Sequence, residues 1–109
     1  MKHHIVLVPF PFDDFSSVKV RPAVCLTNKI GKHHHIVIAF ITSQTPQDKI
    51  ESDISLDSTD ETGLKVKSFL RVHRLTTIPA TLIQRKLGQI PKTKERELNK
   101  KLSVLFGLE

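Results

Sequence analysis

The sequence predicts a mainly β fold, a small barrel with one helix packed across it at the C-terminal end. Short runs rich in β-branched and aromatic residues recur along the first three quarters of the chain, separated by turn formers. The last segment changes to a helical spacing of apolar side chains. With 109 residues, 39% of them hydrophobic and 26% charged, residues 1–109 are expected to form a single globular domain.

Each expected strand is a run of this kind. Residues 5–8 are continuously apolar and end at a proline, and residues 35–41 form the most apolar run. We expect strands at residues 5–8, 20–26, 35–41, 54–56, 68–75 and 83–90, the last broken at Gly88, with turns around Gly31 and over residues 60–63 and 76–81.

A helix is expected after the last proline. Leu98, Leu102 and Leu105 lie at i, i+4 and i+7 and share one helical face. The hydroxyl of Thr93 is suited to capping the first turn, and Gly107 is suited to ending the last one.

Cysteine content and hydropathy indicate the compartment. Cys25 is the single cysteine, so an intrachain disulfide is impossible, and its apolar neighbours predict a buried thiol. The N-terminal apolar run is too short for a secretory signal, and no apolar stretch has membrane-spanning length. We therefore expect a cytoplasmic protein with no membrane association.

The net charge of +6 is unevenly distributed. Residues 48–61 carry six acids against one base, whereas residues 85–109 carry seven bases against three acids. Between them lies a basic run made of Lys65, Lys67, Arg71 and Arg74. Such a balance fits a polyanionic partner such as a nucleic acid, although charge alone leaves open a solvated basic face.

Two segments place phosphate-binding groups at strand ends. Lys19 and Arg21 lie where a loop enters the second expected strand, and a guanidinium presents a fork of donors to phosphate oxygens. Thr42, Ser43 and Gln44 directly follow the most apolar strand, whose end a core would hold rigid. The alternatives are a structural arginine paired with a carboxylate and a group of ordinary turn formers.

The six histidines do not predict a metal site. Consecutive residues of a strand point to opposite faces, so the run at 33–35 does not converge on one ion, and the chain has no cysteine pair to assist. We expect neither a metal nor a cofactor. His73 differs from the others because it lies between Arg71 and Arg74.

Aromatic side chains gather in the first loop. Phe10, Phe12 and Phe15 could stack on unpaired bases, a contact that contributes about 1–3 kcal/mol per base. Because the chain has no Tyr or Trp, the alternative is favoured, in which they fold back over the barrel or form a dimer contact.

Several blocks together resemble the MazF/PemK toxins of bacterial type II toxin–antitoxin systems. The blocks are IVLVPFPF at 5–12, KVRPAV at 19–24, IAFITSQ at 38–44, TGL at 62–64, VHRLTTI at 72–78 and RKLG at 85–88. They cover nearly the whole chain in the same order.

This resemblance implies an SH3-like barrel that forms a homodimer and is neutralised by a cognate antitoxin bound in its RNA groove. It also implies a metal-independent endoribonuclease that cleaves single-stranded RNA, including mRNA. The ribose 2′-hydroxyl would attack, leaving 2′,3′-cyclic phosphate and 5′-hydroxyl ends.

The resemblance also implies roles for individual residues. Arg21 and Thr42 take the catalytic positions, which suits a reaction that needs alignment and charge stabilisation rather than a protein nucleophile. Some relatives have an arginine where this chain has TTIP at 76–79, which leaves open whether His73 or Arg74 compensates. The expected substrate-binding residues are Lys19, Ser43, Gln44, Phe12, His73 and Arg74.

Two other functions fit the same pattern. One is a barrel that inhibits a protein target such as DNA gyrase through its C-terminal helix, with Arg21 dispensable. The other is a non-catalytic module that binds RNA.

Overall fold

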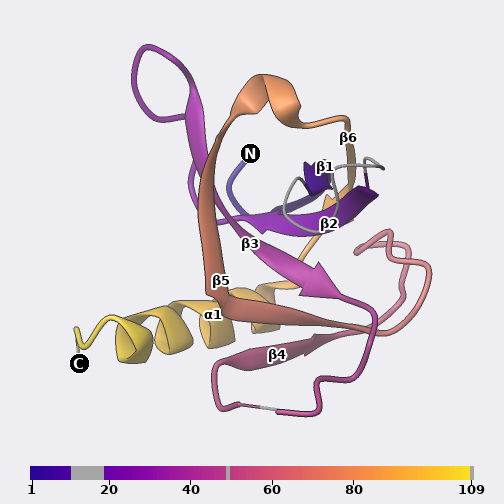
Figure 1. The fold of residues 1–109 in the computed structure, drawn as a ribbon. Coiled ribbons are helices and arrows are strands. Elements are labelled where there is room, and N and C mark those ends of the chain that lie inside the picture. The colour runs from indigo at the N-terminus through magenta and orange to yellow at the C-terminus, as the bar shows by residue number, and fades with distance from the viewer. Residues whose placement is uncertain (11–18, 49, 109) are drawn as a thin grey trace.

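Six antiparallel strands form one curled sheet in the computed structural model, which describes residues 1–10, 19–48 and 50–108 (Figure 1). Their order across the sheet is β4-β5-β3-β2-β1-β6, and a C-terminal helix packs against β4 and β5. The predicted mainly β fold with a terminal helix is therefore confirmed. The elements are β1 (His4–Phe10), β2 (Lys19–Cys25), β3 (His35–Thr42), β4 (Asp53–Leu56), β5 (Ser68–Pro79), the short 3-10 helix η1 (Ala80–Leu82), β6 (Arg85–Gln89) and α1 (Lys92–Leu105).

Both faces of the central strands are buried, which explains their continuous apolar runs. Alternate residues point to opposite faces, so Ile5 belongs to one apolar cluster and Val6 to the other. Leu98 of α1 completes the first cluster, inside the curl of the sheet. The second cluster contains Cys25, whose burial raises the thiol pKa to about 11 and confirms the expected buried cysteine.

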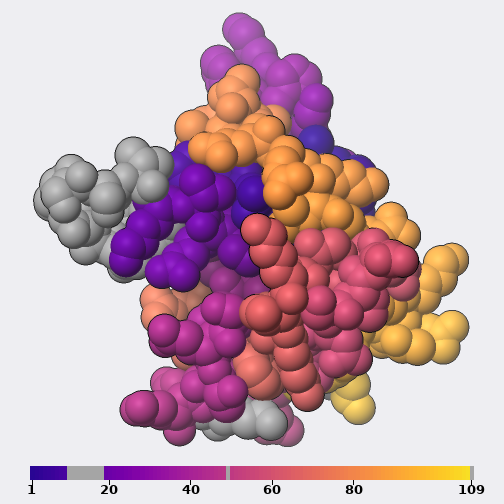
Figure 2. Space-filling model, turned by 90° about the vertical axis from the view of Figure 1, so that its right-hand side faces the viewer, coloured from indigo at the N-terminus to yellow at the C-terminus, as the bar shows by residue number. Residues whose placement is uncertain are grey.

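The loop that follows β4, one edge strand, contacts β6, the other edge strand of the sheet. β4 and β6 are the edge strands, and the segment after β4 lies against β6, as Figure 2 shows for the pink and orange residues. The amide of Gln89 donates to the carbonyl of Glu61 at 2.9 Å. A Cβ added at Gly63 would lie 2.0 Å from the carbonyl oxygen of Leu87, so only glycine permits this closure.

β5 is longer than the sequence predicts. A turn was expected over residues 76–81, but the strand continues to Pro79 because β3 pairs with it as far as His35. Thr76, Thr77 and Ile78 are β-branched and suit that position, and the proline ends the strand. The turn follows as η1, so the last strand begins at Arg85 rather than at residue 83.

The start of α1 also differs from the prediction. Pro91, not Thr93, is the N-cap residue, and it makes no side-chain cap hydrogen bond. Its carbonyl accepts the amides of Lys94 and Glu95 at 2.9 and 3.0 Å. The amide of Ile90 donates to the carbonyl of His3, so the chain is still held beside the start of β1 at this residue. The helix starts directly after it because the proline ring holds the φ of Pro91 at −64°, a value that suits the start of a helix.

Within the described ranges, no helix is long and apolar enough to cross a bilayer. One predicted RNA contact, Phe12, lies outside the described residues.

Candidate functional site

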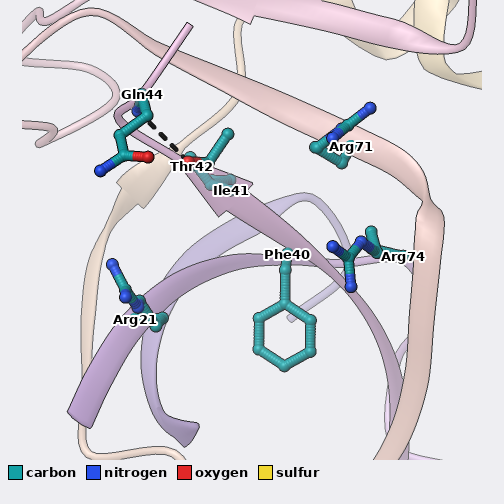
Figure 3. A pocket seen from close by; sticks show the side chains of 7 residues that line it. All are labelled: Arg21, Phe40, Ile41, Thr42, Gln44, Arg71 and Arg74. Atoms are coloured by element: carbon teal, nitrogen blue, oxygen red, sulfur yellow. Dashed lines mark hydrogen bonds between the residues drawn. The ribbon is translucent and has the colours of Figure 1, made fainter. Parts of the chain in front are cut away.

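An open cleft lies at the C-terminal end of β3, where β2, β3 and β5 contribute side chains (Figure 3). Its volume is about 320 Å³. Its described lining consists of Arg21, Phe40, Ile41, Thr42, Gln44, Arg71 and Arg74. The lining residues therefore include three arginines, a threonine and a glutamine, whose side chains carry the donors of an anion-binding site.

Strand pairing brings Arg21 and Thr42 to the same end of the sheet. Ala23 of β2 pairs with Phe40 of β3, and the two strands run antiparallel. Arg21 therefore precedes the last pair by two residues, and Thr42 follows it by two. Two positions separated by 21 residues in the sequence thus line the same cleft.

An irregular stretch of β5 places two arginines in the cleft. Ala39 pairs with Leu75 and Ile41 pairs with Leu70, so residues 71–74 of β5 lie opposite Phe40 alone. In a regular strand, residues i and i+3 point to opposite faces. The extra residues bend β5, as Figure 1 shows, and allow Arg71 and Arg74 to line the same hollow.

The hydroxyl of Thr42 is held by the next turn. The backbone amide of Gln44 donates to Thr42 Oγ1 at 3.2 Å, the dashed line in Figure 3. Because this bond uses an oxygen lone pair, the hydroxyl proton stays available for a ligand in the cleft.

Arg71 is bound by two carboxylates. Its Nε donates to Asp53 Oδ1 at 3.1 Å, and its Nη1 lies 3.3 Å from Asp48 Oδ1. Burial of the guanidinium acts to lower its pKa, but the hydrogen bond and charge of Asp53, together with Asp48, outweigh burial and raise the pKa above its ordinary value. Arg71 therefore stays charged.

The structure brings together some of the predicted site residues and not others. Arg21, Thr42, Gln44 and Arg74 line the cleft. Lys19, Ser43 and His73 are exposed and are not among its described lining residues.

Sequence reasoning did not assign Phe40 and Arg71 to the site. Phe40 lies within the most apolar run of the chain, and nothing in that run indicates a binding site. Arg71 was visible only as part of a basic run, since the bend in β5 that turns it into the cleft leaves no clear local signal.

The described side chains that line the cleft are not typical metal ligands. Its described lining contains no carboxylate, imidazole or thiolate, the groups that usually hold protein-bound metal ions. Elsewhere in the described part of the chain, no three such side chains come close enough to share an ion.

Comparisons with known proteins agree in fold. Residues 1–106 match the model of a family described as PemK-like, MazF-like toxin of type II toxin–antitoxin system. No curated protein sequence is significantly similar to the chain.

Among solved structures, the chain is similar to the Mycobacterium tuberculosis toxin MazF-mt6, with a TM-score of 0.77, 20% identity and coverage of 97% of this chain and 98% of that one. It is also similar to a MazE-MazF structure from Deinococcus radiodurans, with a TM-score of 0.77, 18% identity and coverage of 98% and 95%. A third similar structure is an endoribonuclease in complex with its cognate antitoxin from Mycobacterial species, with a TM-score of 0.75, 13% identity and coverage of 100% and 96%.

Proposed function

Because the chain belongs to the PemK-like, MazF-like toxin family of type II toxin–antitoxin systems, we propose that it is an endoribonuclease that cleaves single-stranded RNA, including mRNA, without a metal ion. The observation that carries this proposal is that Arg21 and Thr42 line one cleft together with two further arginines. The family match and the anion-binding chemistry of the cleft support it independently.

The proposed reaction is an internal transesterification. The ribose 2′-oxygen gives its proton to water and bonds to the adjacent phosphorus, while the bond from phosphorus to the 5′-oxygen breaks. The 5′-oxygen takes up a proton from water and leaves as a hydroxyl, so the products carry 2′,3′-cyclic phosphate and 5′-hydroxyl ends. The attacking group belongs to the RNA, so the protein contributes alignment and charge stabilisation.

Arg21 and Thr42 have the chemistry for these two tasks. The guanidinium of Arg21 would stabilise the negative charge that develops on the phosphoryl oxygens. The hydroxyl of Thr42 would donate to one of those oxygens, since its own oxygen already accepts from the Gln44 amide.

The remaining predicted residues would hold the RNA on either side of the cut. Gln44 and Arg74 line the cleft, where an amide can read a base edge and a guanidinium can bind a neighbouring phosphate. Lys19, Ser43, His73 and Phe12 stay candidate contacts for a longer RNA.

Partners follow from the same proposal. Two of the similar structures are described as MazE-MazF and as an endoribonuclease with its cognate antitoxin. We infer that this chain likewise binds a cognate antitoxin, forms a homodimer and acts in the cytoplasm.

The test is incubation of the purified protein with single-stranded RNA in EDTA, followed by end-group analysis. We expect cyclic-phosphate ends from the wild type and their loss in Arg21→Ala. Arg96→Ala removes an equal charge from an exposed position on α1 and should cleave like the wild type. Equal cleavage by Arg21→Ala, with its fold verified by circular dichroism, would refute the assignment of Arg21.

The end of α1 favours a second candidate function, inhibition of a protein target such as DNA gyrase. Val104, Phe106 and Leu108 are more than half exposed there, an apolar surface of the kind that protein contacts use. A gyrase supercoiling assay distinguishes the two functions, because inhibition that persists in Arg21→Ala would support the protein target.

A further inference from the structure

Arg71 is held by two carboxylates that differ sharply in burial. The side chain of Asp53 is 0% exposed, whereas that of Asp48 is 77% exposed. Arg71 itself is 13% exposed and lines the cleft beside Arg21 and Arg74.

Asp53 is a permanent partner. Its Oδ2 accepts the amide of Ile50 at 3.2 Å, and its backbone carbonyl accepts Lys101 Nζ at 2.7 Å, which ties β4 to α1. A buried carboxylate with this many bonds orients the guanidinium and does not leave it.

Asp48 is an exchangeable partner. An ion pair to a carboxylate this exposed competes with water and salt, so little free energy holds it closed. It engages Nη1 only, and Nη2 is buried with no hydrogen-bond partner among the described residues. Nη1 is therefore the donor that a ligand in the cleft could take over from Asp48.

We propose that Arg71 is an additional phosphate-binding residue of the cleft, and that Asp48 is its resident counter-ion, displaced when RNA binds. The proposal rests on the proposed function, and it adds a contact to a phosphate next to the one that is cleaved. A phosphate that replaces Asp48 at Nη1 would accept the same charge-assisted hydrogen bond and supply the negative charge that the exposed carboxylate now supplies. Asp48 thus stands in for the RNA backbone in the free protein.

The test measures binding of a single-stranded 2′-O-methyl RNA by fluorescence anisotropy, because this RNA lacks the attacking hydroxyl and stays intact. We expect Asp48→Asn to bind about two- to fivefold more tightly than the wild type, since the competing carboxylate is gone. We expect Arg71→Gln to bind at least about tenfold more weakly. In the Arg71→Gln background, Asp48→Asn should give no gain.

Glu51→Gln is the matched control. Glu51 is an exposed acid three residues from Asp48, outside the described lining of the cleft. Its removal changes the net charge equally but does not touch Arg71. If Glu51→Gln and Asp48→Asn tighten binding equally, the effect is general electrostatics and the proposal is wrong.

Other outcomes are equally decisive. Weaker binding by Asp48→Asn would mean that Asp48 orders the cleft rather than competing for it. If Arg71→Gln fails to fold because Asp53 loses its partner, the comparison of Asp48→Asn with Glu51→Gln decides alone, since both residues are exposed. Cleavage and binding by the wild type with unchanged binding by folded Arg71→Gln would refute this inference and leave the proposed function intact, whereas a wild type that neither binds nor cleaves RNA would refute both.

Discussion

Some side-chain groups of the cleft are bound within the protein, and others are available to a ligand. Arg71 directs its Nε to a buried carboxylate, while Arg74 is exposed and has no ion-pair partner within 4.0 Å among the described residues. Thr42 accepts a backbone amide and keeps its proton. These less committed groups are the ones to which the proposed function assigns contacts with RNA.

Removal of the Thr42 hydroxyl should slow cleavage without loss of the fold. We expect Thr42→Val to lower kcat by about 10²–10³-fold, the usual effect of losing one donor to a developing oxyanion. Thr42→Ser keeps the hydroxyl and should retain most activity. Single-turnover cleavage assays measure the difference, and equal rates for the valine and serine variants would exclude a role for the hydroxyl.

The charge of Arg74 should appear in the salt dependence of binding. Each phosphate neutralised on a single strand contributes a slope of about −0.7 to log K against log salt. Arg74→Gln should therefore make the slope of a 2′-O-methyl RNA titration shallower by about that amount. The same change at exposed Arg96, on α1, should leave the slope as in the wild type.

At the scale of elements, the closure of the curled sheet depends on a close approach of backbones. Gly63 has a φ of +69° and lies against Leu87 of β6, and a Cβ added at Gly88 would lie 2.2 Å from the carbonyl oxygen of Glu61. This contact joins the loop after β4 to the opposite edge of the sheet.

Substitution of Gly63 should therefore lower the free energy of unfolding by more than the cost of its left-handed backbone conformation. Gly31 has a similar φ of +71° but faces open space, so Gly31→Ala isolates the cost of left-handed backbone, about 1–2 kcal/mol. Gly63→Ala adds a backbone clash and should lower the free energy of unfolding by about 1–3 kcal/mol more. Urea denaturation measures the free energy of unfolding of both variants. Equal losses of stability would mean that the loop moves away from the added methyl group at no energetic cost.

For the whole molecule, stability should fall as the medium becomes acidic. Burial lowers the pKa of His3 more than the neighbouring Glu95 raises it, and burial with nearby positive charge lowers the pKa of His4. The unfolded chain therefore binds protons first, and the free energy of unfolding decreases as the pH falls through the unfolded value of 6.5. Above that value this contribution is complete.

The measurement is a series of urea denaturation curves from pH 8 to pH 5, a range above the ordinary pKa of carboxyl groups. A double variant, His3→Gln with His4→Gln, should flatten the profile. The other four histidines are exposed, so burial does not single them out as His3 and His4 are singled out. A profile that stays as steep in the double variant would assign the pH dependence elsewhere.

Local sequence determined which elements exist. Short continuous β-branched runs favour strands buried on both faces, and the leucines of α1 share a face only if they are helical. The motifs around Arg21 and Thr42 indicated the family and both candidate catalytic positions. Short sequence blocks in a fixed order can be recognised without any knowledge of the fold.

Tertiary structure decided where elements end and which side chains meet. β5 continues through Thr76 and Thr77 because β3 offers a partner, and strand pairing is a contact between distant segments that local propensity does not contain. Arg71 enters the cleft because four residues of β5 oppose one of β3, a mismatch that no pattern within β5 encodes. The sequence alone thus determined that these strands and the helix exist and indicated Arg21, Thr42, Gln44 and Arg74 as candidate site residues, while the geometry of the cleft and the place of Arg71 in it arose only from pairing.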